Sequence, residues 1–130
     1  MFLRLAILAA LTLGFIGPAL SIPPKPGDKS CREHPQLVGS CFKIHGRLSV
    51  YNGAPALRIW KIGTRRIIGV SDQRFAIAGY RNVPEEVQAK IDQDKVLFGD
   101  YLVCPFTRPR NNEMQLVCIE KATNLVVKKR

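Results

Sequence analysis

The sequence predicts a mainly β fold with one short helix, and three observations support that prediction. The stretch from Cys41 to Val70 alternates apolar and polar residues and contains two turn signals. Pro84-Glu85-Glu86 is typical of a helix start, because proline suits the first helical position and acids complement the helix dipole. Two more strand-like runs, 96–106 and 114–127, flank turn residues at 108–112.

The first hairpin is predicted from alternation and from one dipeptide. Apolar residues at the even positions 42–50 alternate with mostly polar residues at the odd positions 43–51, so one face of this strand belongs to a core. Asn52-Gly53 follows, and this pair favours a two-residue hairpin turn. Pro55 suits an edge or a bulge and allows a register shift of one residue.

A second turn at Gly63-Thr64 extends the same sheet into a third strand. It places Ile59 opposite Ile68 and Leu57 opposite Val70, so the apolar layer of the hairpin continues. Two turns chosen on turn chemistry alone therefore agree on which face is buried.

The outer face of this meander carries the candidate site. The predicted register places Arg47 directly opposite Arg58 and His45 opposite Trp60, and two like charges that face each other are unfavourable. Gly69 beside Arg58 leaves room for an anion that bridges both guanidinium groups. The candidate ligand-binding residues are Lys43, His45, Arg47, Arg58, Trp60, Arg65 and Arg66.

The element order predicts a particular architecture. The helix is expected near Pro84 to Asp92, where Val83, Val87 and Ile91 share a face. Three strands, a helix and two strands follow the order of a small five-stranded OB-like Greek-key barrel, with Gly46 where a long first strand can bend. An open α+β sheet or a small sandwich is the alternative.

The N-terminal region reads as a secretory signal followed by a linker. Residues 1–21 hold Arg4, an apolar run and small residues before a cleavage site after Ser21, which is typical of a signal peptide. Residues 22–30 are rich in proline and are expected to form an extended tether. A single domain is predicted over 31–130, and its basic tail 128–130 is expected to be frayed and solvated.

The chain has four cysteines, which an exported protein most often uses in two disulfides: Cys31, Cys41, Cys104 and Cys118. Cys104 and Cys118 are equidistant from Asn111 at the tip of the last hairpin, so we expect them to face each other and to bond. That pairing leaves Cys31 with Cys41.

The same register has one weak point. It places the apolar Leu102 opposite Glu120, so the alternation is not clean. A bond between Cys41 and Cys118 is therefore the alternative.

No motif in the sequence indicates catalysis or a metal. There is no CxxC pair, and His34 and His45 show no ligand spacing, so we expect neither a metal nor a cofactor. A nucleophile elbow, an HExxH helix and a phosphate loop are all missing from the sequence, which favours a protein that is not an enzyme. The enzymatic alternative is a small basic nuclease-like hydrolase that uses His34 and His45 as acid and base.

The charge balance indicates an anionic partner. The chain has 20 Lys and Arg against 10 Asp and Glu, a formal net charge of +10 at pH 7, which attracts polyanions. We expect a non-enzymatic binding module for an acidic glycan or envelope polymer, and export makes nucleic acid the less expected partner. The alternative is a structural or inhibitory protein that contacts another protein through Tyr51, Trp60 and Ile67.

One pattern resembles a known group of proteins. It consists of Cys41-Phe42, Gly46-Arg47-Leu48, Asn52-Gly53, Pro55, Arg58-Ile59-Trp60, Ile62-Gly63-Thr64, Arg66, Gly69-Val70, Gly99-Asp100-Tyr101 and Val117-Cys118. This pattern is similar to that of small exported bacterial proteins of uncharacterised function. The resemblance implies a bacterial periplasmic or extracellular setting, and it implies no activity, ligand or catalytic residue.

Overall fold

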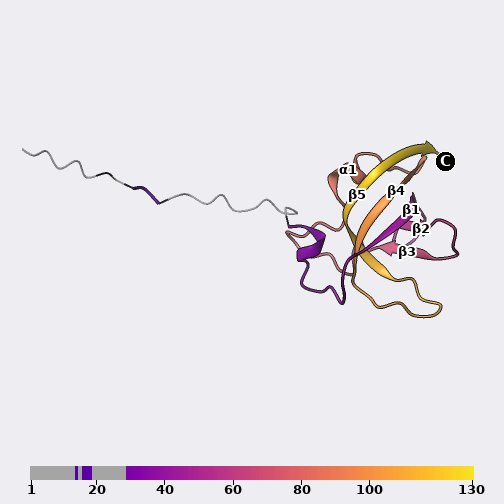
Figure 1. Ribbon diagram of the computed structural model, residues 1–130, viewed down its shortest axis with the longest axis horizontal. Helices are drawn as coiled ribbons and strands as arrows, with labels where there is room; N and C mark the ends of the chain where they lie inside the picture. Colours follow the sequence, from indigo (N-terminus) through magenta and orange to yellow (C-terminus); the bar gives the residue numbers. More distant parts are fainter. Residues whose placement is uncertain (1–13, 15, 19–28) are drawn as a thin grey trace, which may run out of the picture.

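The protein is a closed five-stranded barrel, seen in a computed structural model that describes residues 14, 16–18 and 29–130. The elements are a 3-10 turn η1 (Cys31–Glu33), β1 (Phe42–Val50), β2 (Leu57–Lys61), β3 (Ile67–Val70), α1 (Glu85–Gln88), β4 (Lys95–Pro105) and β5 (Leu116–Lys129). The strands close in the order β1-β2-β3-β5-β4, with β3 and β5 parallel and every other pair antiparallel (Figure 1). The predicted mainly β, OB-like barrel is therefore confirmed.

Every strand contributes at least one fully buried residue to the core. Leu48, Ile59, Ile68, Leu97 and Val117 come from the five strands in turn, and each has 0% of its surface exposed. Burying an aliphatic side chain of this size contributes about 1.5–3 kcal/mol to stability. The inward face of each strand is thus set by its own alternation.

Gly46 of β1 allows the neighbouring strand β2 to approach closely. It pairs with Lys61 on β2 and with Gly99 on β4. A Cβ at this position would lie 2.4 Å from Cγ2 of Ile59, so only glycine allows β2 to approach this closely.

The predicted register of the first hairpin is wrong by two residues. Leu48 lies opposite Ile59, and Arg47 lies opposite Trp60 rather than opposite Arg58. The Tyr51 N–H donates to the Ala56 carbonyl, so residues 52–55 form a four-residue loop. Pro55 has no N–H to give to a ladder, which explains the wider loop. A shift of two keeps the predicted buried face.

The second turn and the helix follow the sequence more closely. Ile59 lies opposite Ile68 as predicted, and the Lys61 N–H donates to the Arg66 carbonyl across the turn. The helix α1 covers only part of the predicted segment, with Pro84 as its N-cap and Val87 fully buried against the core. Short as it is, it places one apolar side chain into the barrel.

Both ends of the described domain are held in place. The Lys29 N–H donates to the Gly79 carbonyl, so the end of the predicted tether is paired to the domain. The expectation of a frayed C-terminus is wrong, because β5 runs to Lys129 and stays paired with β4. The Arg130 N–H donates to the Asp94 carbonyl, and its Nη1 donates to the Val50 carbonyl at 2.7 Å.

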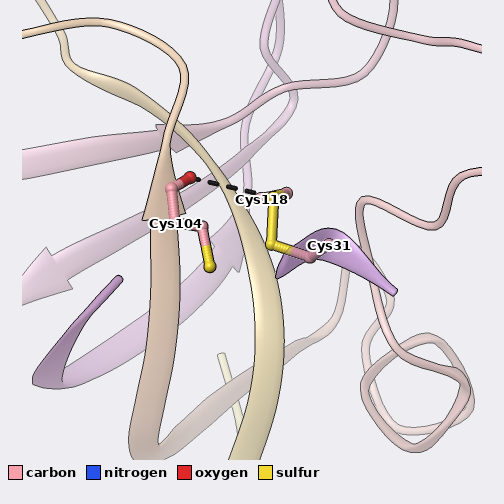
Figure 2. Close-up of side chains that lie close together, drawn as sticks. All are labelled: Cys31, Cys104 and Cys118. Atoms are coloured by element: carbon pink, nitrogen blue, oxygen red, sulfur yellow. Dashed lines mark hydrogen bonds between the residues drawn. A yellow bond between two sulfur atoms is a disulfide. The ribbon is translucent and has the colours of Figure 1, made fainter. Parts of the chain in front are cut away.

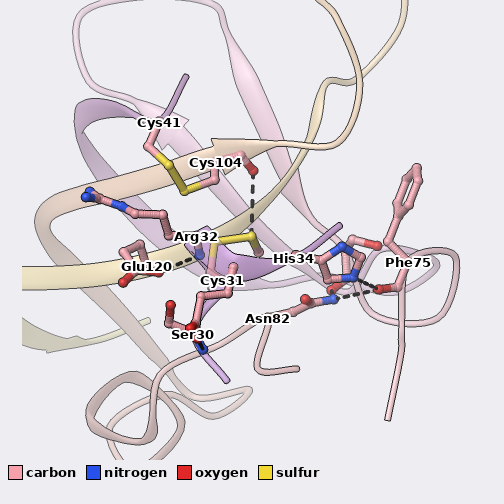
Figure 3. The surroundings of a disulfide bond; sticks show 12 residues. Ser30, Cys31, Arg32, His34, Cys41, Phe75, Asn82, Cys104 and Glu120 are labelled. Atoms are coloured by element: carbon pink, nitrogen blue, oxygen red, sulfur yellow. Dashed lines mark hydrogen bonds between the residues drawn. A yellow bond between two sulfur atoms is a disulfide. The ribbon is translucent and has the colours of Figure 1, made fainter. Parts of the chain in front are cut away.

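The two strands of the last hairpin contain a bulge where the alternation failed. Cys104 lies opposite Cys118 as predicted, and Val103 lies opposite Ile119. Leu102 then pairs with Lys121, so Glu120 is the extra residue of the bulge. The Glu120 carboxylate accepts a hydrogen bond from the Arg32 N–H at 2.7 Å, which ties η1 to β5 (Figure 3).

The predicted disulfide pairing is wrong in both bonds. The structure joins Cys31 to Cys118 and Cys41 to Cys104 (Figures 2 and 3). In the ring, β4 lies between β5 and β1, so Cys41 lies one position beyond the Phe42–Val103 pair and faces Cys104. The sequence alone does not show that β4 lies beside β1, because the two strands are far apart in the chain.

The predicted signal peptide and most of the tether lie outside the described residues, apart from 14, 16–18 and 29–30. Within the part of the chain that is described, no helix has the length and apolar character that a membrane span requires.

Candidate functional site

The outer face of β1 carries an arginine whose cross-strand neighbours on both sides are aromatic residues. Arg47 pairs with Trp60 on β2 and with Phe98 on β4, so the three side chains form one row across the barrel. The Arg47 guanidinium carbon lies 5.0 Å from the centre of the Trp60 ring, and Lys128 Nζ lies 5.2 Å from the centre of the Phe98 ring. We call Arg47, Trp60, Phe98 and Lys128 the arginine platform.

Within the arginine platform, a hydrogen bond fixes the Trp60 ring, whereas the Nε of Arg47 has no hydrogen-bond partner. The Trp60 Nε1–H donates to the Thr64 carbonyl at 2.7 Å, and the Thr64 hydroxyl donates to the Lys61 carbonyl at 2.8 Å, so the indole is fixed by its own turn. Arg47 Nε is buried without a hydrogen-bond acceptor. No carboxylate of the described residues lies within ion-pair distance of Arg47. Because Nε is buried, an anion from solvent can reach this guanidinium only through the part of the half-buried side chain that remains exposed.

A groove of about 470 Å³ adjoins the platform on the outer face of β1, β4 and β5. Its first row places Leu102 between Lys43 and Lys121, and its second row places Asp100 between His45 and Thr123. We call it the lysine groove; its lining residues are Lys43, Ile44, His45, Asp100, Leu102, Lys121, Thr123 and Asn124. Lys43, His45 and Arg47 alternate along one face of β1, so groove and platform form a surface about 13 Å long.

Asp100 is the fixed negative charge of the groove. Its two carboxylate oxygens accept hydrogen bonds from Asn124 Nδ2 and from His45 Nδ1, each at 2.8 Å. These bonds, that of Asn124 first, and the nearby charges of His45 and Lys43 lower the pKa of Asp100 from its usual value. Because an ionised carboxylate only accepts, His45 Nδ1 must donate, and Nε2 is left without a partner among the described residues.

Three predicted site residues are directed elsewhere. Arg58 lies opposite Ser49, its Nε donates to the Pro55 carbonyl at 3.0 Å, and its guanidinium carbon lies 4.8 Å from the centre of the Tyr51 ring. Arg66 donates through Nη2 to Gln115 Oε1, and Arg65 is exposed in the turn. The predicted bridge between Arg47 and Arg58 therefore has no geometric basis.

The room expected above Gly69 is filled. A Cβ at Gly69 would lie 2.5 Å from Pro55 Cγ and 2.8 Å from Met114 Sδ. The wide first loop and the loop before β5 thus meet over β3, and they leave no approach for an anion there. Of the predicted residues, the structure brings Lys43, His45, Arg47 and Trp60 together.

The two histidines have different roles. His34 is 3% exposed, its Nε2–H donates to the Phe75 carbonyl at 3.0 Å, and its Nδ1 accepts from the Gln36 N–H at 3.1 Å (Figure 3). Its ring also packs edge-on against Phe106. His34 is therefore a satisfied core residue, whereas the His45 side chain is 64% exposed.

Sequence reasoning missed half of this surface because it lies on the last two strands. Phe98 and Leu102 are apolar residues at outward positions of β4, and Lys121 and Lys128 are cations of β5. Their outward alternation is visible in the sequence. That they lie beside β1 depends on the strand order of the closed ring, which neighbouring residues do not specify.

Comparison with known proteins adds no relative: the chain matches no family model, no curated protein and no solved structure.

Proposed function

We propose that this protein is a non-enzymatic binding module for an anionic polymer, which it holds along the outer face of β1 and β4. The observation that carries the proposal is Arg47, a half-buried cation between Trp60 and Phe98 that has no ion-pair partner among the described residues. An anionic group of the ligand satisfies this guanidinium, and the fixed indole offers a plane on which a ring can stack. The formal net charge of +10 favours the approach of such a polymer.

The same surface supports binding rather than turnover. His34, the second member of the histidine pair considered for a nuclease, is buried with both ring nitrogens engaged. General acid–base hydrolysis with two histidines needs both within reach of the substrate. A protein partner is the second candidate, because the exposed Ile67 (38%) and Val126 (51%) extend the platform row at its two ends.

The test measures binding through the single tryptophan. Trp60 fluorescence is followed while the protein is titrated with polygalacturonate, dextran sulfate, polyphosphate and neutral dextran. We expect an anionic polymer, and not dextran, to change the fluorescence, with affinity that falls steeply as salt rises. Arg47→Ala should weaken binding by about tenfold, the scale of one lost charge-assisted contact.

Arg110→Ala is the matched control, because it removes the same charge from the exposed loop between β4 and β5. Equal loss in both variants would mean that net charge alone attracts the polymer and that the platform is not a site. Salt-independent binding of a protein that is lost in Ile67→Ser or Val126→Ser would favour the second candidate.

We also infer that the chain is exported and cleaved after Ser21. Two disulfides fit an oxidising compartment. The intact mass of protein recovered from the periplasm or medium should correspond to a chain that begins at Ile22 and lacks four thiol hydrogens. An uncut chain or free thiols would remove this argument.

A further inference from the structure

We propose that the lysine groove binds an acidic sugar, with the carboxylate of a uronate unit between Lys43 and Lys121. This inference rests on the proposed function and names the ligand class at the adjoining part of the same surface. It depends on what the groove combines: two cations, one apolar residue between them and one fixed carboxylate.

The first row of the groove favours a ring that carries a negative group. Lys43 and Lys121 flank Leu102 in the register of β1, β4 and β5, so two ammonium groups border an apolar floor. Neither ammonium group lies within ion-pair distance of a carboxylate in the described residues. A sugar acid matches this row, because the C–H face of its ring packs on Leu102 while its carboxylate lies between the lysines.

The second row discriminates between anions. Asp100 is held ionised by Asn124 and His45, so it repels a densely charged ligand such as polyphosphate. It remains able to accept hydrogen bonds, because each carboxylate oxygen has a second lone pair. Hydroxyl groups of a sugar fit an environment of Asp100, Thr123 and the free Nε2 of His45, whereas phosphate oxygens have no proton to donate.

The size of the groove agrees with such a ligand. Its volume of about 470 Å³ lies within the usual range of small-ligand sites. One end of the groove continues along β1 to Arg47 and Trp60, so a second unit of the same polymer reaches the arginine platform. The lysine groove and the arginine platform then bind neighbouring units of one polymer, and the groove determines which kind of sugar is accepted.

The experiment follows backbone amide shifts of the purified protein with trigalacturonate. Maltotriose serves as the neutral match, and tripolyphosphate and a short RNA serve as other anions. We expect trigalacturonate to shift Lys43, Leu102, Lys121 and Thr123, with little effect of maltotriose. Lys43→Gln and Lys121→Gln should each weaken binding about three- to fivefold, as for one partly exposed ion pair, whereas Lys90→Gln, outside the groove, should leave it unchanged.

Asp100→Asn provides the second readout, because it tests selectivity rather than affinity. Removing the fixed charge should narrow the preference for trigalacturonate over tripolyphosphate by about fivefold, since a repulsion of roughly 1 kcal/mol between partly exposed charges is lost. Equal binding of tripolyphosphate or RNA to the wild-type groove, or uronate binding unaffected by Lys121→Gln, would overturn the inference.

The outcomes separate this inference from the proposed function. Shifts that centre on Arg47 and Trp60 with no response at Lys121 would leave the anion-binding platform standing and remove the uronate groove. No response on either part of the surface would remove both.

Discussion

Cys104 and Cys118 lie directly opposite each other on β4 and β5, and neither is bonded to the other. Cys118 Sγ instead lies 3.8 Å from the Cys104 carbonyl oxygen while its disulfide reaches back to Cys31 (Figure 2). Cys104 uses its other cross-strand neighbour, Cys41. The two bonds therefore attach the segment before β1 to two adjacent strands.

Removal of the bond between Cys31 and Cys118 should cost about 2–5 kcal/mol of unfolding free energy, because it closes a loop of sequence separation 87. Urea unfolding of Cys31→Ala/Cys118→Ala measures the loss, and peptide mapping under non-reducing conditions identifies the pairs. A peptide that joins Cys104 to Cys118 would contradict the assigned connectivity.

Tyr101→Phe should destabilise the barrel by about 1 kcal/mol. The Tyr101 side chain is fully buried, and its hydroxyl donates to the Leu97 carbonyl at 2.6 Å. The substitution keeps the ring and leaves that carbonyl without its donor. Burial also raises the pKa of Tyr101 well above its usual range. In an alkaline titration followed by tyrosine absorbance, the wild-type protein should therefore show one tyrosine that ionises only on unfolding, and Tyr101→Phe should lack it.

Gly46→Ala should be strongly unfavourable, by about 1–3 kcal/mol, because the added Cβ meets Ile59 Cγ2 and the Trp60 carbonyl oxygen. Gly39→Ala is the matched control, since the nearest atom there, Pro105 Cγ, lies at an ordinary contact distance of 3.5 Å. Thermal unfolding compares the two. Similar unfolding midpoints for the two variants would mean that β1 and β2 can move apart at Gly46 without loss of stability.

Asp100 should make stability depend on acid. Its folded pKa is lowered, so its contribution is fully present above the unfolded value near pH 4 and is lost as pH falls through the folded pKa. Asn124→Gly should raise that pKa, because it removes the first of the two hydrogen bonds and keeps a residue suited to the positive φ of 53° at this position. Carboxyl-carbon NMR follows the titration, and an unchanged midpoint would rule out the role of Asn124.

Much of the fold is predictable because strand faces and turns are local properties. The Gly63-Thr64 turn correctly predicts Ile59 opposite Ile68. The poor match of Leu102 with Glu120 coincides with a bulge, but the alternative bond that it suggested, between Cys41 and Cys118, is wrong. The Asn52-Gly53 signal predicts a two-residue turn, but Pro55 widens the loop and shifts the register of the first hairpin by two residues. The buried face survived that error, since a shift of two residues preserves alternation.

The candidate site was less predictable because it depends on contacts between distant segments. The alternation within β1 and β2 is enough to predict Lys43, His45, Arg47 and Trp60. Phe98 and Lys121 became neighbours of these residues only through the closure of β4 onto β1 and β5. The closure of the barrel and the disulfide pairing both depend on how all five strands pack together, and not on the spacing of residues close in the sequence.

The three sulfur atoms of Cys31, Cys104 and Cys118 all lie within 4.8 Å of one another, which bears on how the protein oxidises as it folds. A bridge between Cys104 and Cys118 closes the shortest of the loops that involve Cys104, so loop entropy favours it early. We expect this non-native species among acid-trapped refolding intermediates. Attack by the Cys31 thiolate on Cys118 Sγ then forms the native bond and releases the Cys104 thiolate. The bond between Cys104 and Cys41 forms in a separate step, in which an external disulfide such as oxidised glutathione accepts the two electrons.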